Sequence, residues 1–367
     1  MTHPLPPGAT LGVLTSGGDA PGMNAAIRTA TKVGLARGFS VLGIHNGYQG
    51  LLDGRAERLS HRDVDGIVRY GGTVLGSARE PRFRTDAGRA LAQRRIDELG
   101  LHALLVIGGD GSLTGAKHAT SLRAVDGAPL RVLGVPASID NDVGCTSLSI
   151  GVDTAVNTIV EAVDRIADTA RAHERTFIVE VMGRDCGYLA MVAGIASAAD
   201  AILYRESGRS HDAMLGRLCD VVRNAYLPSE GRDPKRMVLI VKAEGVTLPS
   251  SEIKRHLDEQ LGDEVPGLQT RVTVLGHLVR GGAPSAMDRL VAARLANVAV
   301  LALADGRSGE MAAWRPPFGD RGPYDPHCGL FDLDTVLRET AGIRNGTSEL
   351  SRKRVALMAS VEDVLSL

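Results

Sequence analysis

Short apolar runs alternate with longer helical patterns along this chain, and that alternation constrains the fold more than any other feature of the sequence. The run at residues 11–14 is followed by a helical pattern at 23–37 and by a second run at 41–44. Such a rhythm is typical of a parallel sheet with crossover helices, and it predicts an α/β protein. Further strand-like runs lie at residues 103–107, 132–135, 177–181, 201–204, 238–241 and 272–275.

The length of the chain predicts two similar lobes. At 367 residues it exceeds what a single hydrophobic core usually organises. We expect each lobe to hold a mostly parallel sheet flanked by helices, with the active site in the cleft between them. We assign residues 1–150 to a larger lobe and 151–310 to a second lobe, with the chain crossing between them.

Residues 311–367 are expected to form a carboxy-terminal extension that packs back on the lobes. The Pro/Gly-rich stretch at 314–326 predicts a loop that introduces it. Residues 348–354 and 355–367 together predict a helix of mixed charge. The extension is expected either to cover a subunit surface or to have no role.

Charge and cysteine content exclude several classes of function. The 42 basic and 43 acidic residues give a net charge of -1, so nothing attracts the chain in bulk to nucleic acid or to a membrane. The 4 cysteines form no CxxC pair, which argues against a disulfide framework or a zinc cluster. No signal peptide is apparent, and the longest aliphatic run, at 298–304, is too short to span a bilayer. We expect a cytoplasmic enzyme or small-molecule binder.

Two glycine-rich loops follow predicted strands. The stretch TSGGDAPGMN at 15–24 follows the first strand, and GGDGS at 108–112 follows the run at 103–107. Paired glycines let the backbone approach a ligand, and the start of the next helix stabilises an anion. Each loop alone could be a tight turn, but together they favour a phosphate site, with Asp110 as a candidate magnesium ligand.

The spacing of these glycines argues against two common nucleotide-binding folds. Neither loop has the spacing GxGxxG, and the chain contains no GxxxxGK[ST]. A Rossmann dehydrogenase and a Walker-type NTPase are therefore disfavoured.

A third loop, at residues 136–142, concentrates carboxylates after a strand. Ser138, Asp140 and Asp142 lie within one turn and have no basic residue beside them in the sequence. Uncompensated acids in such a place suit metal binding or proton transfer.

Six segments, in order along the chain, resemble the phosphofructokinase family: LTSGGDAPGMNAAIR, GGTVLGSAR, GGDGS, SIDND, VEVMGRDCG and RVTVLGHLVRGG. A GGDG loop alone also resembles NAD kinases and lipid kinases, but its combination with IDND, MGR and GHxxRGG is specific. The resemblance implies a 6-phosphofructokinase, which uses ATP and Mg²⁺ to phosphorylate the 1-hydroxyl of fructose 6-phosphate in glycolysis. The products would be fructose 1,6-bisphosphate and ADP.

The same resemblance implies roles for the catalytic residues. Asp140 would be the general base for the sugar 1-hydroxyl, and Asp142 would support the metal and substrate around it. Arg184 would neutralise charge on the transferring phosphoryl group, which Ser138 should also touch. The family usually has threonine at position 138, and serine keeps the hydroxyl but lacks the methyl group that restricts its rotamer.

Residues 1–150 would bind ATP and magnesium and carry the catalytic loops. Asp110 would hold Mg²⁺ against the donor phosphates. The positions implied to line the nucleotide site are Gly18, Tyr48, Arg79, Arg84, Gly109, Asp110, Gly111 and Ser112.

Residues 151–310 would bind the sugar phosphate. Arg175 and Arg271 resemble arginines that reach the 6-phosphate from a neighbouring subunit, which implies a homotetramer or a homodimer. Taken singly, an exposed arginine or a lone histidine is more often structural, but the GHxxRGG and HxR contexts favour a site. The remaining implied substrate residues are Met182, Gly183 and Glu244 around the sugar, His277 and Arg280 on its 6-phosphate, and the catalytic Ser138, Asp140, Asp142 and Arg184.

Three other functions remain open. A pyrophosphate-dependent phosphofructokinase typically has aspartate at the position of Gly111 and lysine at that of Ala137, so the residues present favour ATP. A related kinase could act on another ketose phosphate, such as sedoheptulose 7-phosphate. A non-catalytic sugar-phosphate sensor is expected to lose base or metal residues, whereas Asp110 and Asp140 both remain.

Overall fold

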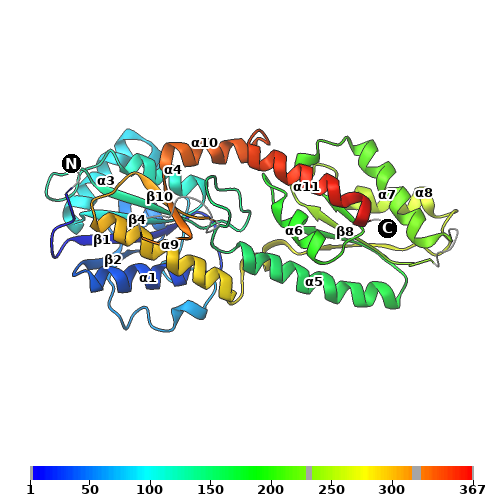
Figure 1. Cartoon of the computed structure of the whole chain (residues 1–367), viewed down its shortest axis with the longest axis horizontal. Helices are drawn as coiled ribbons and strands as arrows, with labels where there is room; N and C mark the ends of the chain where they lie inside the picture. Colours follow the sequence, from blue (N-terminus) through cyan, green and yellow to red (C-terminus); the bar gives the residue numbers. More distant parts are fainter. Residues whose placement is uncertain (1–2, 229–233, 316–323, 366–367) are drawn as a thin grey trace. The chain divides into compact units, whose positions relative to one another are not determined.

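The computed structural model describes residues 3–228, 234–315 and 324–365, and the chain divides into two compact units (Figure 1). Unit 1 contains Met1–Thr154 and Arg280–Ala341, and unit 2 contains Ala155–Val279 and Gly342–Leu367. Each unit has its own largely parallel sheet with flanking helices, as the α/β prediction requires. These units do not coincide with the predicted ranges 151–310 and 311–367, because the chain returns to the sheet of unit 1 after the last strand of unit 2.

The sheet of unit 1 has the strand order β11-β10-β5-β4-β1-β2-β3. Its inner pairs are parallel, whereas β3 and β11 add antiparallel edges. Every residue of β4 is buried, as expected for a strand covered on both faces. The strands predicted at 11–14, 41–44, 103–107 and 132–135 are confirmed. The bounds are β1 Thr10–Ser16, β2 Ser40–Ile44, β3 Ala56–Arg58, β4 Ala103–Gly108, β5 Arg131–Pro136, β10 Glu310–Trp314 and β11 Cys328–Asp332.

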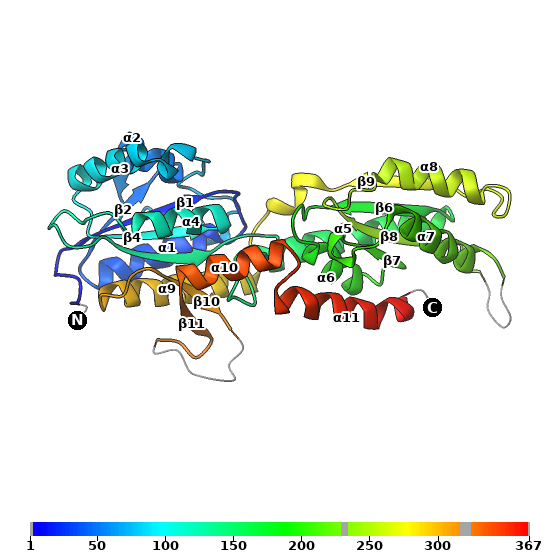
Figure 2. The ribbon, with the colours of Figure 1, turned by 90° about the horizontal axis from the view of Figure 1, so that it is seen from above.

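Helices cover both faces of this sheet (Figure 2). One face is covered by α1 and α9, which pack against each other, and the other by α2, α3 and α4. Apolar side chains of the second group, such as Leu51, Ile96 and Leu113, pack with Leu104 and Val106 of β4 to form a core. The bounds are α1 Met23–Ala36, α2 Gly47–Asp53, α3 Asp86–Leu99, α4 Asp110–Ala119, α9 Ala286–Ala304 and α10 Leu333–Arg344.

The sheet of unit 2 has the order β7-β8-β6-β9, and all its pairs are parallel. The helix α11 packs against α6, β7 and the short helix η3, Arg205–Ser207. The predicted helix near the carboxyl terminus is therefore confirmed, and it belongs to unit 2. The bounds are β6 Thr176–Val181, β7 Ala201–Leu203, β8 Val238–Ala243, β9 Thr270–Val274, α5 Val152–Ala172, α6 Tyr188–Ala196, α7 His211–Tyr226, α8 Ser250–Leu261 and α11 Glu349–Leu365.

Within the described ranges, no helix combines the length and the apolar character that crossing a membrane requires.

Candidate active site

A pocket of about 490 Å³ lies at the carboxyl ends of β1, β4 and β5 in unit 1. These strands are adjacent, in the order β5-β4-β1, so the loops that follow them share one edge of the sheet. The volume is typical of a site for a small molecule. The pocket is lined by Ser16, Gly17, Gly18, Tyr48, Arg79, Glu80, Pro81, Phe83, Arg84, Gly109, Asp110, Gly111, Ser112, Gly115, Ala137, Ser138, Asp140 and Arg280.

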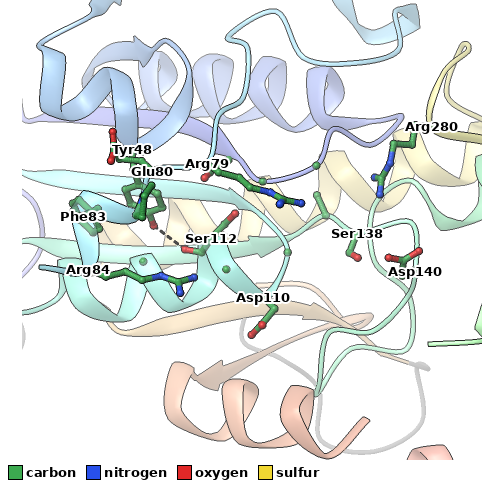
Figure 3. Close-up of a pocket in the computed structure, with 18 residues that line it drawn as sticks. Tyr48, Arg79, Glu80, Phe83, Arg84, Asp110, Ser112, Ser138, Asp140 and Arg280 are labelled. Atoms are coloured by element: carbon green, nitrogen blue, oxygen red, sulfur yellow. Dashed lines mark hydrogen bonds between the residues drawn. The ribbon is translucent and has the colours of Figure 1, made fainter. Parts of the chain in front are cut away.

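This pocket brings together every residue that the sequence placed in the nucleotide site, from Gly18 to Ser112. Figure 3 shows Asp140, Ser138 and Arg280 at one end of it. Tyr48 and Phe83 lie at the other end. The pocket therefore runs from an aromatic wall to the carboxylate loop, and its two ends differ in chemistry.

The glycine loops form the middle of the pocket. Gly17 has φ 86°, in the left-handed region that favours glycine, and its carbonyl accepts a hydrogen bond from Ser77 Oγ at 2.5 Å. Gly109 is the N-cap of α4, so the amino end of this helix faces the same loop. Ser112 is 2% exposed, and within the described residues its buried Oγ has no hydrogen-bond partner. A helix start and a buried hydroxyl of this kind suit an anionic ligand.

The loop after β5 is held in shape by Asn141. This residue has φ 48°, a conformation that asparagine tolerates better than most residues. Its Nδ2 donates to the Ser147 carbonyl at 3.1 Å, and its Oδ1 accepts from Ser149 N at 3.0 Å. The turn that carries Asp140 and Asp142 is therefore fixed from both sides.

Asp142 acts on the pocket indirectly. Ser138 Oγ donates to Asp142 Oδ1 at 2.7 Å, and Ser138 rather than Asp142 lines the pocket. Asp140 lines the pocket directly. The two predicted carboxylates thus differ in place, because one faces the cavity and the other orients a hydroxyl.

Tyr48 forms the wall at the far end. Its hydroxyl donates to the Ser112 carbonyl at 2.7 Å, and its ring stacks on Phe83 with centroids 4.3 Å apart. Burial raises the pKa of Tyr48 well above its usual value, so the phenol stays neutral and keeps its hydrogen bond. This end offers a flat apolar surface.

Glu80 is a pocket residue that sequence reasoning missed. Its side chain is 5% exposed, and its Oε1 accepts from Arg82 N and Arg82 Nε, both at 2.9 Å. The hydrogen bonds from Arg82 hold the pKa of the Glu80 carboxyl below its usual value. Glu80 and Arg82 are two positions apart in the sequence, so a search for acid–base pairs at that spacing could have identified Glu80. Pro81, Phe83 and Gly115 were also missed, whereas Ser16, Gly17 and Ala137 belong to the predicted loops at 15–24 and 136–142.

The packing of Gly115 against Tyr48 yields a first prediction. An alanine Cβ at Gly115, a buried position in α4, would lie 2.5 Å from the Tyr48 ring. The ring is confined by Phe83 and cannot move away without loss of packing. We expect Gly115→Ala to lower the free energy of unfolding by about 1–3 kcal/mol, as overpacking usually does. Urea denaturation would measure the change.

Gly216→Ala is the matched control for this substitution. Gly216 lies within α7 and is exposed, and its added Cβ would meet no atom within 4 Å. It should gain about 0.5–1 kcal/mol, the usual difference between glycine and alanine inside a helix. Equal effects of the two changes would contradict the packing argument.

Residues predicted around the sugar follow β6 and β8 in unit 2. Met182, Gly183 and Arg184 come directly after β6, and Glu244 comes directly after β8. The carboxyl ends of β6 and β8 are connected by a hydrogen bond, because Glu244 N donates to the Val181 carbonyl at 2.8 Å. His277, in the short helix η4, Gly276–Arg280, is exposed, as is Arg184. Arg280 is the first residue of the second stretch of unit 1 and lines the pocket there, where its Nη1 donates to the Asp19 carbonyl at 3.2 Å.

Arg175 and Arg271 lie at the other end of the unit 2 sheet. Gln269 Oε1 accepts from Arg175 Nε and from Arg271 Nη2, both at 3.0 Å. The whole of β6 separates Arg175 from Met182, and at about 3.3 Å per residue that is roughly 20 Å. Unit 2 therefore does not bring these two arginines to Arg184 and Glu244.

The predicted magnesium ligand, Asp110, lines the pocket. The described ranges contain no group of three or more His, Cys, Asp or Glu residues placed to bind a metal ion. Mg²⁺ is usually bound by one or two carboxylates together with substrate phosphates and water. Asp110, a carboxylate in the first turn of α4 beside the glycine loop, fits that mode.

Comparisons with known proteins agree with the geometry. A family model described as phosphofructokinase matches residues 10–303. An ATP-dependent 6-phosphofructokinase from Thermotoga petrophila is 43% identical over 83% of this chain and 89% of its own length. One from Oceanobacillus iheyensis is 45% identical over 82% of this chain and 88% of its own.

Solved structures give the same family. The phosphofructokinase of Saccharomyces cerevisiae matches with a TM-score of 0.83 and 32% identity over 95% of this chain, which spans about half, 48%, of the yeast chain. A pyrophosphate-dependent phosphofructokinase from Marinobacter aquaeolei, at 19% identity and a TM-score of 0.74, supports the fold alone. Because the family model covers most of the chain and relatives above 40% identity extend over four-fifths of it, the chain belongs to the phosphofructokinase family.

Proposed function

We propose that this protein transfers the γ-phosphoryl group of ATP to the 1-hydroxyl of fructose 6-phosphate, giving fructose 1,6-bisphosphate and ADP. The observation that carries the proposal is the unit 1 pocket, which joins an aromatic wall, two glycine loops and the carboxylate Asp140 in one cavity. The ATP-dependent relatives support it. Such a reaction belongs to glycolysis, and on that ground we propose the cytoplasm as its location.

Asp140 is the proposed general base of this reaction. A base must lie where the phosphoryl group arrives, and Asp140 faces the pocket at the end opposite Tyr48 (Figure 3). Asp142 would keep Ser138 in place through their hydrogen bond, with Ser138 beside the same phosphoryl group. Arg184 would neutralise the charge that develops on it.

Asp110 is the proposed protein ligand of magnesium. When bound, Mg²⁺ would neutralise charge on the donor phosphates. Beside it, Ser112 Oγ and the amino end of α4 would bind phosphate oxygens, and Arg79 and Arg84 add positive charge to the same pocket. The Tyr48 and Phe83 wall would receive the apolar part of the nucleotide.

The sugar phosphate is proposed to bind Met182, Gly183, Arg184, Glu244, His277 and Arg280, together with the carboxylate loop. Arg175 and Arg271 lie at the far end of the same sheet as Arg184, which supports their proposed action on the site of a neighbouring subunit. A site completed in this way needs an oligomer, and we propose a homotetramer. Sedimentation of the native protein would measure the assembly, and an active monomer would contradict the shared site.

The direct test of function compares phosphoryl donors. Fructose 6-phosphate is incubated with the enzyme and Mg²⁺, once with ATP and once with pyrophosphate, and fructose 1,6-bisphosphate is measured. We expect product with ATP alone. Product only with pyrophosphate would transfer the proposal to the pyrophosphate-dependent alternative, and no product with either donor would favour a sensor. Turnover with sedoheptulose 7-phosphate tests the acceptor.

Gly111 provides a sharper prediction about the donor. An added Cβ there would meet only Arg84 Nη2, at 3.7 Å, so protein packing does not require glycine. A carboxylate about 6 Å from a phosphate repels it by about 3 kcal/mol at an effective dielectric constant of about 20. Gly111→Asp should therefore weaken ATP binding roughly a hundredfold, as measured by calorimetry.

Gly111→Ala is the control, and it should bind ATP within about threefold of the unaltered protein because its contact is ordinary. An acidic residue in the first turn of α4 favours the helix, so Gly111→Asp should fold normally. Unchanged ATP affinity in Gly111→Asp would place the donor phosphates elsewhere.

A further inference from the structure

The loop that carries Arg184 contacts residues from the second stretch of unit 2, Gly342–Leu367, which we call the carboxy-terminal segment. We define the Arg184 loop as residues 182–187, between β6 and α6. Arg344 Nη2 donates to Asp185 Oδ2 at 2.6 Å. Arg205 completes the cluster, since its Nη1 donates to Asp185 Oδ1 at 3.5 Å and its Nη2 to the Arg344 carbonyl at 3.1 Å. The residue directly after Arg184 is thus bound by two guanidinium groups.

A second contact comes from α11. Arg354 Nη1 lies 3.6 Å from Cys186 Sγ, and its guanidinium lies 4.4 Å from the centroid of the Tyr188 ring. Cys186 is 1% exposed, whereas Arg354 and Tyr188 are half-buried. A cation over an aromatic ring is attractive, and more so when water is excluded. Figures 1 and 2 both show α11 lying along α6, the helix that the loop leads into.

The helix α11 is itself fixed at both ends. At its start, Ser348 Oγ accepts from Ser351 N at 3.0 Å, and Ser351 Oγ donates to the Ile343 carbonyl at 3.1 Å. Near its end, Glu362 is 5% exposed and accepts from Arg209 Nη1 at 2.8 Å and Arg209 Nη2 at 2.5 Å. Arg354 therefore projects from a helix that is held at both ends.

The loop backbone leaves little freedom around Arg184. Gly183 has φ 128°, and a Cβ there would lie 2.6 Å from the Cys186 carbonyl oxygen. Gly187 N donates to Glu206 Oε1 at 2.8 Å. The backbone is thus fixed on both sides of Arg184, whereas the Arg184 side chain is exposed.

We propose that the carboxy-terminal segment, through Arg344 and Arg354, positions Arg184 for phosphoryl transfer. The inference rests on the proposed function, in which Arg184 stabilises the transferring group. Such stabilisation depends on preorganisation, and a displacement of about 1 Å can cost a hundredfold in rate. Both positioning residues lie outside residues 10–303, which the family model matches. A role limited to stability is the competing explanation, because α11 also covers α6 and β7.

The test compares Arg344→Met and Arg354→Met with Lys353→Met. Lys353 lies on α11 beside Arg354 and pairs at the surface with Glu349, with side chains 73% and 74% exposed. Its loss therefore removes the same charge as either arginine variant without touching the loop. We expect each arginine variant to lower kcat by about 10- to 100-fold while KM for ATP and for fructose 6-phosphate stays within about threefold. Lys353→Met should leave all three values unchanged.

Two further measurements separate positioning from stability. Deuterium uptake of the peptide containing residues 182–187 should rise in both arginine variants, and Arg344→Lys, which keeps the charge beside Asp185, should retain most of kcat. Arg344 and Asp185 side chains are each 38% exposed, so Arg344→Met should fold even if Arg354→Met does not. Normal kcat in folded Arg344→Met, or an equal loss in Lys353→Met, would overturn the proposal. If the unaltered protein forms no product with either donor, the proposed function itself fails.

Discussion

Replacing Arg184 with methionine is expected to lower kcat for fructose 1,6-bisphosphate formation by about 10³-fold or more. Arginines that neutralise a transferring phosphoryl group contribute about 10³- to 10⁵-fold in other phosphotransferases. Methionine keeps much of the side-chain volume and removes the guanidinium. Because the interaction strengthens as charge develops in the transition state, KM for both substrates should change much less than kcat. Steady-state kinetics with each substrate varied would measure both.

Arg165→Met is the control for the Arg184 substitution. Arg165 is 78% exposed on α5, where it pairs with Glu161, and it belongs to the same unit. Its loss should leave kcat unchanged. Arg184→Lys should recover only part of the rate, because a point charge cannot reproduce a bidentate fork. If Arg184→Met raised KM while kcat stayed normal, Arg184 would serve ground-state binding instead.

Asp140→Asn should lower kcat by about 10²- to 10⁴-fold, the range that general-base catalysis contributes. The amide has nearly the shape of the carboxylate but cannot accept the proton of the sugar hydroxyl. The turn should persist, since Asn141 holds it through bonds to Ser147 and Ser149 that do not involve the Asp140 side chain. Binding of ATP and fructose 6-phosphate, measured by calorimetry, should stay within about threefold.

The control for charge loss is Asp168→Asn. Asp168 is 83% exposed on α5 and pairs only at the surface with Arg171. Its loss should change neither kcat nor the affinity for either substrate. Near-normal turnover of Asp140→Asn would exclude Asp140 as the base and direct attention to Asp142, which lies next to Ser138.

Much of the site could be predicted because its signals are local. Continuous apolar runs identified β1, β4 and β5, and the glycine and carboxylate loops directly follow them. Parallel strands place such loops at one edge, and Asp110 and Asp140 both line the pocket there. By contrast, α2 and β3 are too short to show a clear period, and sequence reasoning missed them.

By itself, the sequence determined the α/β class, the family and the residue types of the nucleotide loops, because periodicity and turn chemistry act over a few positions. Only the tertiary structure decided which unit each segment joins. Glu310 pairs with Leu133 across the sheet, which returns the chain to unit 1, and no local pattern encodes that partner. Likewise, Arg344 reaches Asp185 and Arg354 reaches Cys186 across separations of 159 and 168 residues. Such contacts depend on how complete surfaces fit together in three dimensions, and a reading along the chain cannot supply that information.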